Sequence, residues 1–117
     1  MYQKDLELER QWHLLLDQLE LTFSKRPSDL ESVLFLIGVQ ELGQGVKLFT
    51  KEEKQDLMHI AICKVLSLSG FYKLEGLDEE GWPHWCLVKK LPSFDLLEQE
   101  KLLKIHIVEY FEAETIW

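Results

Sequence analysis

The stretch from Thr50 to Gly70, TKEEKQDLMHIAICKVLSLSG, constrains the fold more than any other part of the chain. Thr50 is a favourable helix N-cap and Glu53 completes a capping box, while Gly70 suits a left-handed C-terminal end. Because a helix that is apolar nearly all round belongs in the interior of a domain, we expect other elements to pack against several of its sides. Beyond the first turn its apolar residues are Leu57, Met58, Ile60, Ala61, Ile62, Val65, Leu66 and Leu68.

Start and stop signals for helices recur along the chain. Trp12 and several leucines recur at three- and four-residue intervals in a first amphipathic stretch, which Pro27 ends. Asp95 and Glu98 have the spacing of a capping box at the start of a last stretch. Together with the central segment, these signals predict four helices, at 5–26, 29–42, 51–69 and 95–112.

Gly38 interrupts the apolar run VLFLIGV of the second predicted helix. A glycine inside a helix costs about 1 kcal/mol relative to alanine. We therefore expect the backbone of another helix to approach closely at this position.

Between the third and fourth helices the pattern changes to that of a β-hairpin at 71–90, with strands near 71–77 and 84–90. The turn is the acidic segment Asp78-Glu79-Glu80-Gly81, and Pro83 fits the start or the edge of a strand. The fold class that follows is mainly α: a four-helix, orthogonal or bundle-like domain with one hairpin between helices 3 and 4.

Length and composition predict a single domain at 1–117. A chain of 117 residues with 46% hydrophobic residues can bury a sizeable core without metal or disulfides. Two cysteines make no disulfide framework, which points to a reducing compartment. The N-terminal segment MYQKDLELER lacks the apolar core of a signal sequence, and the longest apolar run is too short to span a membrane. We therefore expect a cytoplasmic protein with no membrane partner and no cofactor.

The charge balance argues against nucleic acid as a partner. The formal net charge is −8, and no quarter of the chain has more basic than acidic residues. Neutralisation of phosphates by lysine and arginine supplies most of the affinity for nucleic acid, so a basic face is expected in such proteins.

Two pairs of residues could carry metal chemistry. His59 and Cys63 are four apart on the central helix, and His84 and Cys86 are two apart in a strand, so the members of each pair share a face. If the hairpin folds over that side of the helix, the four could form a tetrahedral zinc site. The other interpretation is that both cysteines are small buried hydrophobes, and the absence of a CxxC pair favours it.

A cysteine nucleophile is a second chemical option, because each cysteine has a histidine close by in sequence. No oxyanion feature accompanies either cysteine, and burial in an apolar helix disfavours the Cys63 thiolate. The sequence therefore predicts no catalytic residue, and an enzyme is not the favoured interpretation.

The segment Gly81-Trp82-Pro83-His84-Trp85 is the strongest candidate for a binding surface. Tryptophan and tyrosine dominate binding hot spots because they bring a large, rigid area at a small entropic cost. We expect at least one of the two tryptophans to be buried against the helices. A docked or self-associating C-terminal end, Ile116-Trp117, is a second candidate. The candidate binding residues are Tyr72, Trp82, His84, Trp85 and Trp117.

The stretches VLFLIGVQELGQG, KEEKQDLMHIAICKVLSLSGFY and LEGLDEEGWPHW resemble a small group of short bacterial proteins that have no assigned function. The resemblance implies a self-standing bacterial protein, and it implies no activity, ligand or catalytic residue.

The leading hypothesis is a small, soluble, non-catalytic interaction module that binds itself, as a homodimer, or another protein. The first alternative is a winged-helix-like nucleic-acid-binding protein, since three helices precede a two-stranded wing. The acidic total and the apolar third helix, which offers few polar side chains for base edges, argue against it. The second alternative is the metal-binding protein described above. The lysines that could gather on one side of a winged helix are Lys51, Lys54, Lys64, Lys73, Lys89 and Lys90.

Overall fold

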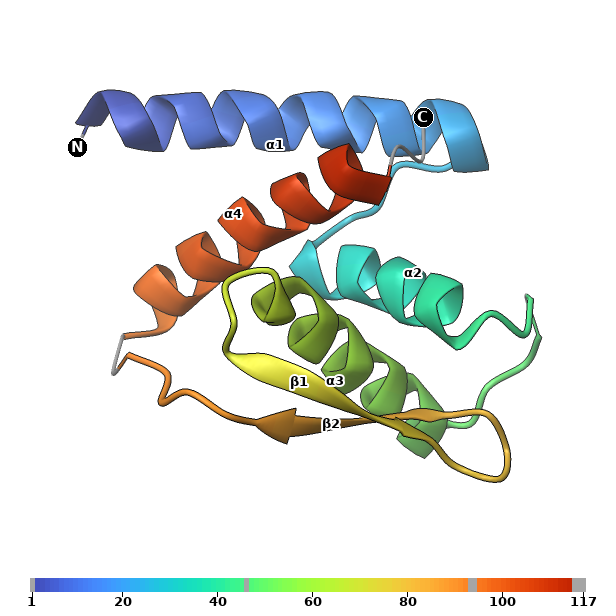
Figure 1. Cartoon of the computed structure of the whole chain (residues 1–117). Helices are drawn as coiled ribbons and strands as arrows, with labels where there is room; N and C mark the ends of the chain where they lie inside the picture. The colour runs from blue at the N-terminus through green and yellow to red at the C-terminus, as the bar shows by residue number, and fades with distance from the viewer. Residues whose placement is uncertain (1, 46, 93–94, 115–117) are drawn as a thin grey trace. The chain divides into compact units, whose positions relative to one another are not determined.

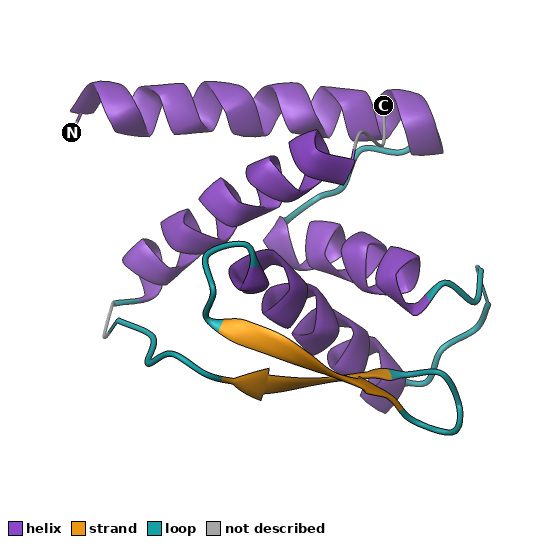
Figure 2. Cartoon of the chain, viewed as in Figure 1, coloured by secondary structure: helices purple, strands orange, loops and turns teal. Residues whose placement is uncertain are grey.

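The computed structural model describes residues 2–45, 47–92 and 95–114, with side chains from Asp5 to Ala113. Within these ranges the chain forms four helices and one antiparallel hairpin inserted between α3 and α4, which confirms the predicted fold class (Figures 1 and 2). No helix among the described residues is long and apolar enough to cross a membrane. The elements are α1 (Tyr2–Phe23), α2 (Leu30–Leu42), α3 (Lys51–Ser67), β1 (Tyr72–Leu77), β2 (Pro83–Leu87) and α4 (Leu96–Glu114).

The chain divides into two compact units, Met1–Leu30 with Phe94–Trp117, and Glu31–Ser93. The first unit contains α1 and α4, and the second contains α2, α3 and the hairpin. The single domain expected from the sequence stays a prediction.

In the first unit, α1 contacts α4 through an apolar stripe and a set of ion pairs. Lys104 is the most buried cation of this contact: its Nζ lies 3.2 Å from Glu9 and 5.3 Å from the centre of the Trp12 ring. Trp12 is itself buried, as its place on the apolar stripe predicted. α1 ends at Phe23, earlier than the predicted residue 26, because Ser24 adopts a left-handed φ of 62° that interrupts the helix before Pro27.

In the second unit, α2 crosses α3 at Gly38. A Cβ atom at this position would lie 2.2 Å from the carbonyl oxygen of Leu57, so only glycine allows this approach. The close approach expected at Gly38 is therefore confirmed. The residues buried along the two helices are Val33, Leu34, Ile37 and Leu42 of α2, with Leu57, Ile60, Ala61, Cys63, Val65 and Leu66 of α3.

The ends of α3 form as predicted from its sequence. The Thr50 side chain accepts a hydrogen bond from the Glu53 N–H, and the Glu53 carboxylate accepts one from the Thr50 N–H, which completes the capping box. Gly70 follows with φ 80° and donates to the Ser67 carbonyl, while Phe71 donates to the Leu66 carbonyl. This pair of bonds is the Schellman ending of a helix, and it turns the chain directly into β1.

The hairpin packs along α3 (Figure 1). Its register pairs Tyr72 with Leu87 and Leu74 with Trp85, and an irregularity follows Leu74. β2 ends at Leu87 rather than at the predicted residue 90, because the N–H groups of the next two residues both donate to one carbonyl, that of Phe71.

We expect Gly38→Ala to destabilise the second unit, although alanine is the better helix former. The added methyl group meets backbone atoms of Leu57, which cannot rotate away, so the cost is that of overpacking, about 2–3 kcal/mol. Chemical denaturation followed by circular dichroism measures this change. Gln40→Ala, on the exposed side of the same helix, is the control and should change the free energy of unfolding by about 0.5 kcal/mol or less. Equal stability of the two variants would contradict the close approach.

Candidate functional site

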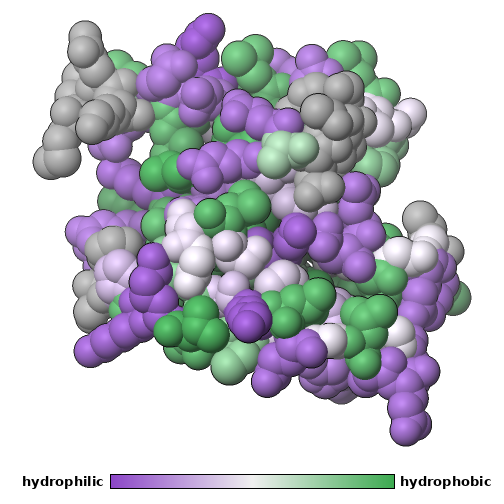
Figure 3. Space-filling view, in the orientation of Figure 1, coloured by the Kyte–Doolittle hydropathy of each residue, from purple (hydrophilic) through white to green (hydrophobic). Residues whose placement is uncertain are grey.

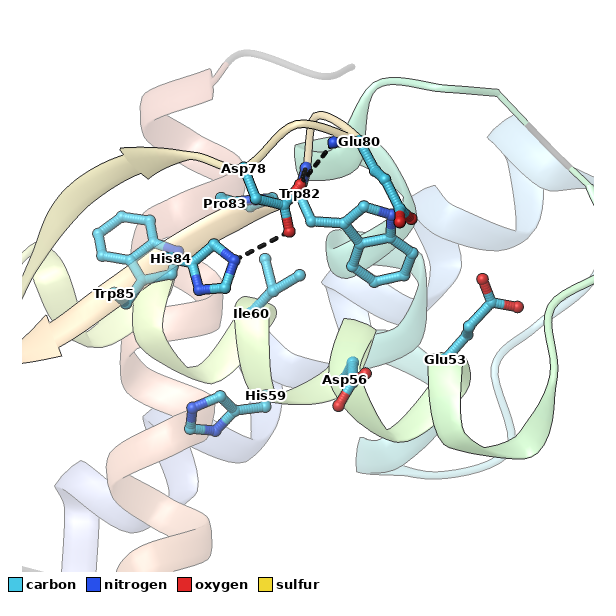
Figure 4. A pocket seen from close by; sticks show the side chains of 10 residues that line it. All are labelled: Glu53, Asp56, His59, Ile60, Asp78, Glu80, Trp82, Pro83, His84 and Trp85. Carbon is cyan, nitrogen blue, oxygen red and sulfur yellow. Dashed lines mark hydrogen bonds and ion pairs between the residues drawn. The ribbon is translucent and has the colours of Figure 1, made fainter.

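An open pocket of about 420 Å³ lies between α3 and the tip of the hairpin (Figure 4). Both walls belong to the second unit. The wall on the α3 side consists of Glu53, Asp56, His59 and Ile60, and the wall on the hairpin side of Asp78, Glu80, Trp82, Pro83, His84 and Trp85.

Asp78 fixes the hairpin wall. Its carboxylate accepts hydrogen bonds from the backbone N–H groups of Glu80 and Trp82, both at 2.9 Å, and its second oxygen lies 2.9 Å from Nε2 of His84. The Asp78 carbonyl also accepts from the N–H of Gly81, whose φ of 86° suits a glycine. One side chain therefore organises the turn and orients the histidine, in the manner of an Asx turn.

These contacts change the acidity of Asp78. The hydrogen bond to His84 is the largest cause that lowers the pKa of the Asp78 carboxyl below its ordinary value of 3.8, and the backbone N–H of Trp82 is the next. Each of these donors stabilises the ionised carboxylate more than the neutral acid. Asp78 therefore stays charged when other exposed carboxylates begin to take up protons.

Gln44, in the loop between α2 and α3, forms a hydrogen bond to the hairpin turn. Its side-chain amide donates to the Glu80 carbonyl at 2.8 Å, and its oxygen accepts from Lys47 Nζ at 2.8 Å. This contact was not predicted, since the amide of a loop glutamine gives no sequence signal for a tertiary contact.

The two tryptophans of the candidate segment both line the pocket, and both are half-buried. This differs from the expectation of at least one buried tryptophan, because the hairpin packs along α3 and leaves part of each ring uncovered. Figure 4 shows the side chains of Trp82 and His84 extending from the hairpin toward α3, with Ile60 between the two walls. The Nε1 atom of Trp85 is buried and has no hydrogen-bond partner among the described residues.

The other candidate binding residues lie elsewhere. Tyr72 does not line the pocket; it is half-buried, and burial together with the nearby Cys63 raises the pKa of its hydroxyl. Trp117 and Ile116 fall outside the described residues.

The four residues of the zinc hypothesis are found in separate arrangements. His59 Nε2 lies 3.5 Å from the Cys63 sulfur, whereas His84 pairs with Asp78 and the Cys86 thiol donates to the Leu87 carbonyl at 3.7 Å. Among the residues that the structure describes, no group of three or more histidine, cysteine and acidic side chains could hold a metal ion. Asp78 was not predicted as the partner of His84, because in the sequence a turn aspartate six residues away is not distinguishable from a solvated one.

The environment of Cys63 is unfavourable for a nucleophile. Cys63 is fully buried, and desolvation raises the pKa of its thiol to about 11. Cys86 is exposed on the hairpin, so the interpretation of both cysteines as buried hydrophobes holds for Cys63 and is wrong for Cys86.

A second hollow, of about 270 Å³, lies in the first unit between α1 and α4. Its lining combines aliphatic side chains with two amides and one carboxylate, which is not a constellation typical of catalysis or metal binding. The residues are Gln11, Leu14, Leu15, Gln18, Val108 and Glu112.

Several apolar side chains of the hairpin are exposed, namely Leu74, Leu77, Leu87 and Val88. On the face drawn in Figure 3, hydrophobic side chains are interspersed with hydrophilic ones. Because the exposed apolar side chains are interspersed with hydrophilic ones, the pocket is the better defined candidate for a binding site.

The chain matches no protein-family model, no curated protein and no solved structure.

We expect the two cysteines to differ sharply in reactivity. At pH 8 a thiol with a pKa of about 11 is ionised in roughly one molecule in a thousand, and Cys63 is also inaccessible. Titration with Ellman's reagent should detect one fast thiol per native chain and two after unfolding in guanidinium chloride. The Cys86→Ser variant should show no fast thiol. Two fast thiols in the native protein would reopen the nucleophile hypothesis.

We also expect the Asp78 carboxyl to titrate below 3.8 and to return toward that value in His84→Ala, because the largest cause of the shift is then removed. The two backbone donors should keep the shift from vanishing. A carboxyl whose pKa is lower in the folded state stabilises that state above its unfolded pKa, and this contribution disappears as the pH falls through the folded pKa. NMR titration of the carboxyl carbon measures both midpoints, and His13→Ala, an exposed histidine of the first unit, is the control. Identical midpoints in the wild type and His84→Ala would contradict the assignment.

Proposed function

We propose that this chain is a small, non-catalytic interaction module, and that a segment of a protein partner docks in the pocket between α3 and the hairpin tip. The observation that carries the proposal is that two half-buried tryptophans line an open pocket of about 420 Å³. A pocket of this size that offers aromatic surface and a few fixed polar groups is typical of ligand recognition. An indole ring has few rotatable bonds, so it loses little conformational entropy on binding.

The pocket residues favour binding over catalysis. The Asp78–His84 pair has the geometry of a base and its orienting group, at 2.9 Å. None of the ten lining residues, however, is a serine, threonine, cysteine, lysine or tyrosine, so the pair has no hydroxyl, thiol or amine nucleophile among them. In this proposal the pair holds the shape of the turn, and the tryptophans supply the contact.

The nucleic-acid alternative receives less support. Four carboxylates line the pocket, and α3, which would be the recognition helix, buries residues on several sides and contacts both strands. Self-association through the C-terminal end, a cytoplasmic location and a bacterial origin remain expectations from the sequence that accompany this proposal.

A selection from a random peptide library displayed on phage, against the full chain, tests the proposal. We expect peptides that bind the wild type, and we expect Trp82→Ala to weaken their binding at least tenfold, since a tryptophan at the centre of an interface contributes about 2 kcal/mol or more. Fluorescence anisotropy with the synthesised peptides measures the affinities.

The matched control is Phe23→Ala, which removes an exposed aromatic side chain of the first unit. This variant should bind as the wild type does. Circular dichroism verifies that both variants are folded. A library that yields no binder, or binders that tolerate Trp82→Ala, would refute the proposed docking site.

A further inference from the structure

The negative charge of the pocket determines which kind of partner side chain can bind there. Two carboxylates come from α3, Glu53 and Asp56, and two from the turn, Asp78 and Glu80. No lysine or arginine is among the lining residues. Acidic groups on both walls of one pocket create a negative potential there, which favours a positively charged ligand.

Two of these carboxylates are already engaged within the protein. Asp78 pairs with His84 and with the backbone of the turn, and Glu53 accepts the Thr50 N–H in the capping box. Among the described residues, the side chains of Asp56 and Glu80 have no hydrogen bond and no ion pair. One unpaired carboxylate is thus available on each wall.

The tryptophans add a second, independent preference for a cation. The face of an indole ring attracts an ammonium or guanidinium group more strongly than any other aromatic side chain does. Figure 4 shows the Trp82 ring lying on the side of the pocket where Glu80, Glu53 and Asp56 are drawn. Aromatic faces combined with carboxylates are the chemistry that recognises organic cations.

The same groups do not suit a metal ion. The part of the chain that the structure describes contains no cluster of three or more histidine, cysteine and acidic side chains able to hold one. A basic side chain needs no such cluster, because a single carboxylate and one ring face already bind it.

The geometry points to a lysine or arginine side chain of the partner as the group that enters this pocket, held between Asp56 and Glu80 against the indole of Trp82. This inference rests on the proposed function and names the ligand chemistry of the same site.

The probes that test it are three pentapeptides, acetyl-Gly-Gly-X-Gly-Gly-amide, with lysine, arginine or the uncharged norleucine at X. We expect the lysine and arginine peptides to cause saturable NMR shifts of the Trp82 and Trp85 indole N–H signals, and norleucine to cause none. Binding should weaken as salt is raised from 20 to about 150 mM, because the interaction is between charges near the surface.

Asp56→Asn and Glu80→Gln should each weaken binding of the arginine peptide about three- to tenfold. Glu79→Gln removes the neighbouring charge of the same turn, outside the pocket lining, and should change binding less than twofold. Equal binding of norleucine, or an effect of Glu79→Gln as large as that of Glu80→Gln, would overturn the inference.

The two proposals can fail separately. Library peptides that depend on Trp82 but carry no basic residue would refute the cationic ligand and leave the docking site intact. Saturable binding of the arginine peptide without any Trp82-dependent library peptide would refute the protein-docking role and support the cation pocket.

Discussion

The packing of α2 on α3 at Gly38 is the constraint on which the second unit depends. The backbone of α2 lies so close to the Leu57 carbonyl that no side chain fits between them. This contact fixes α3, and the apolar sides of α3 that remain are covered in part by the hairpin. The pocket is therefore built on a helix that the backbone of α2 approaches closely at Gly38.

Hydrogen bonds at the two ends of the hairpin then give the pocket its shape. The Schellman ending at Gly70 directs the chain from α3 into β1, so the hairpin returns along the helix from which it came. At the far end of the hairpin, Asp78 closes the turn and holds His84, while Gln44 ties the same turn to the loop before α3. Trp85 on β2 and Trp82, directly before it, are consequently held by a hydrogen-bonded turn, and such pre-organisation lowers the entropic cost of binding.

The sequence predicted the elements well because their signals are local. Capping at Thr50, the stop before Pro27 and the acidic turn at 78–81 depend on residues close in the chain, and each was found within a few positions of its prediction. The candidate site was predicted less completely. Trp82, His84 and Trp85 line the pocket, but Tyr72 does not, and the roles of Asp78 and Gln44 were missed because their partners lie on other elements.

The sequence by itself determined the mainly helical composition, the hairpin between the third and fourth helices and the need for a close helix contact at Gly38. These follow from periodicity, capping and the conformational cost of glycine, which act over a few residues. Only the tertiary structure decided that His59 and His84 have different partners, that Cys86 is exposed, and that carboxylates from α3 and from the turn line one pocket. Those outcomes depend on how the hairpin lies on α3, because side chains distant in sequence interact only after packing has brought their backbones together.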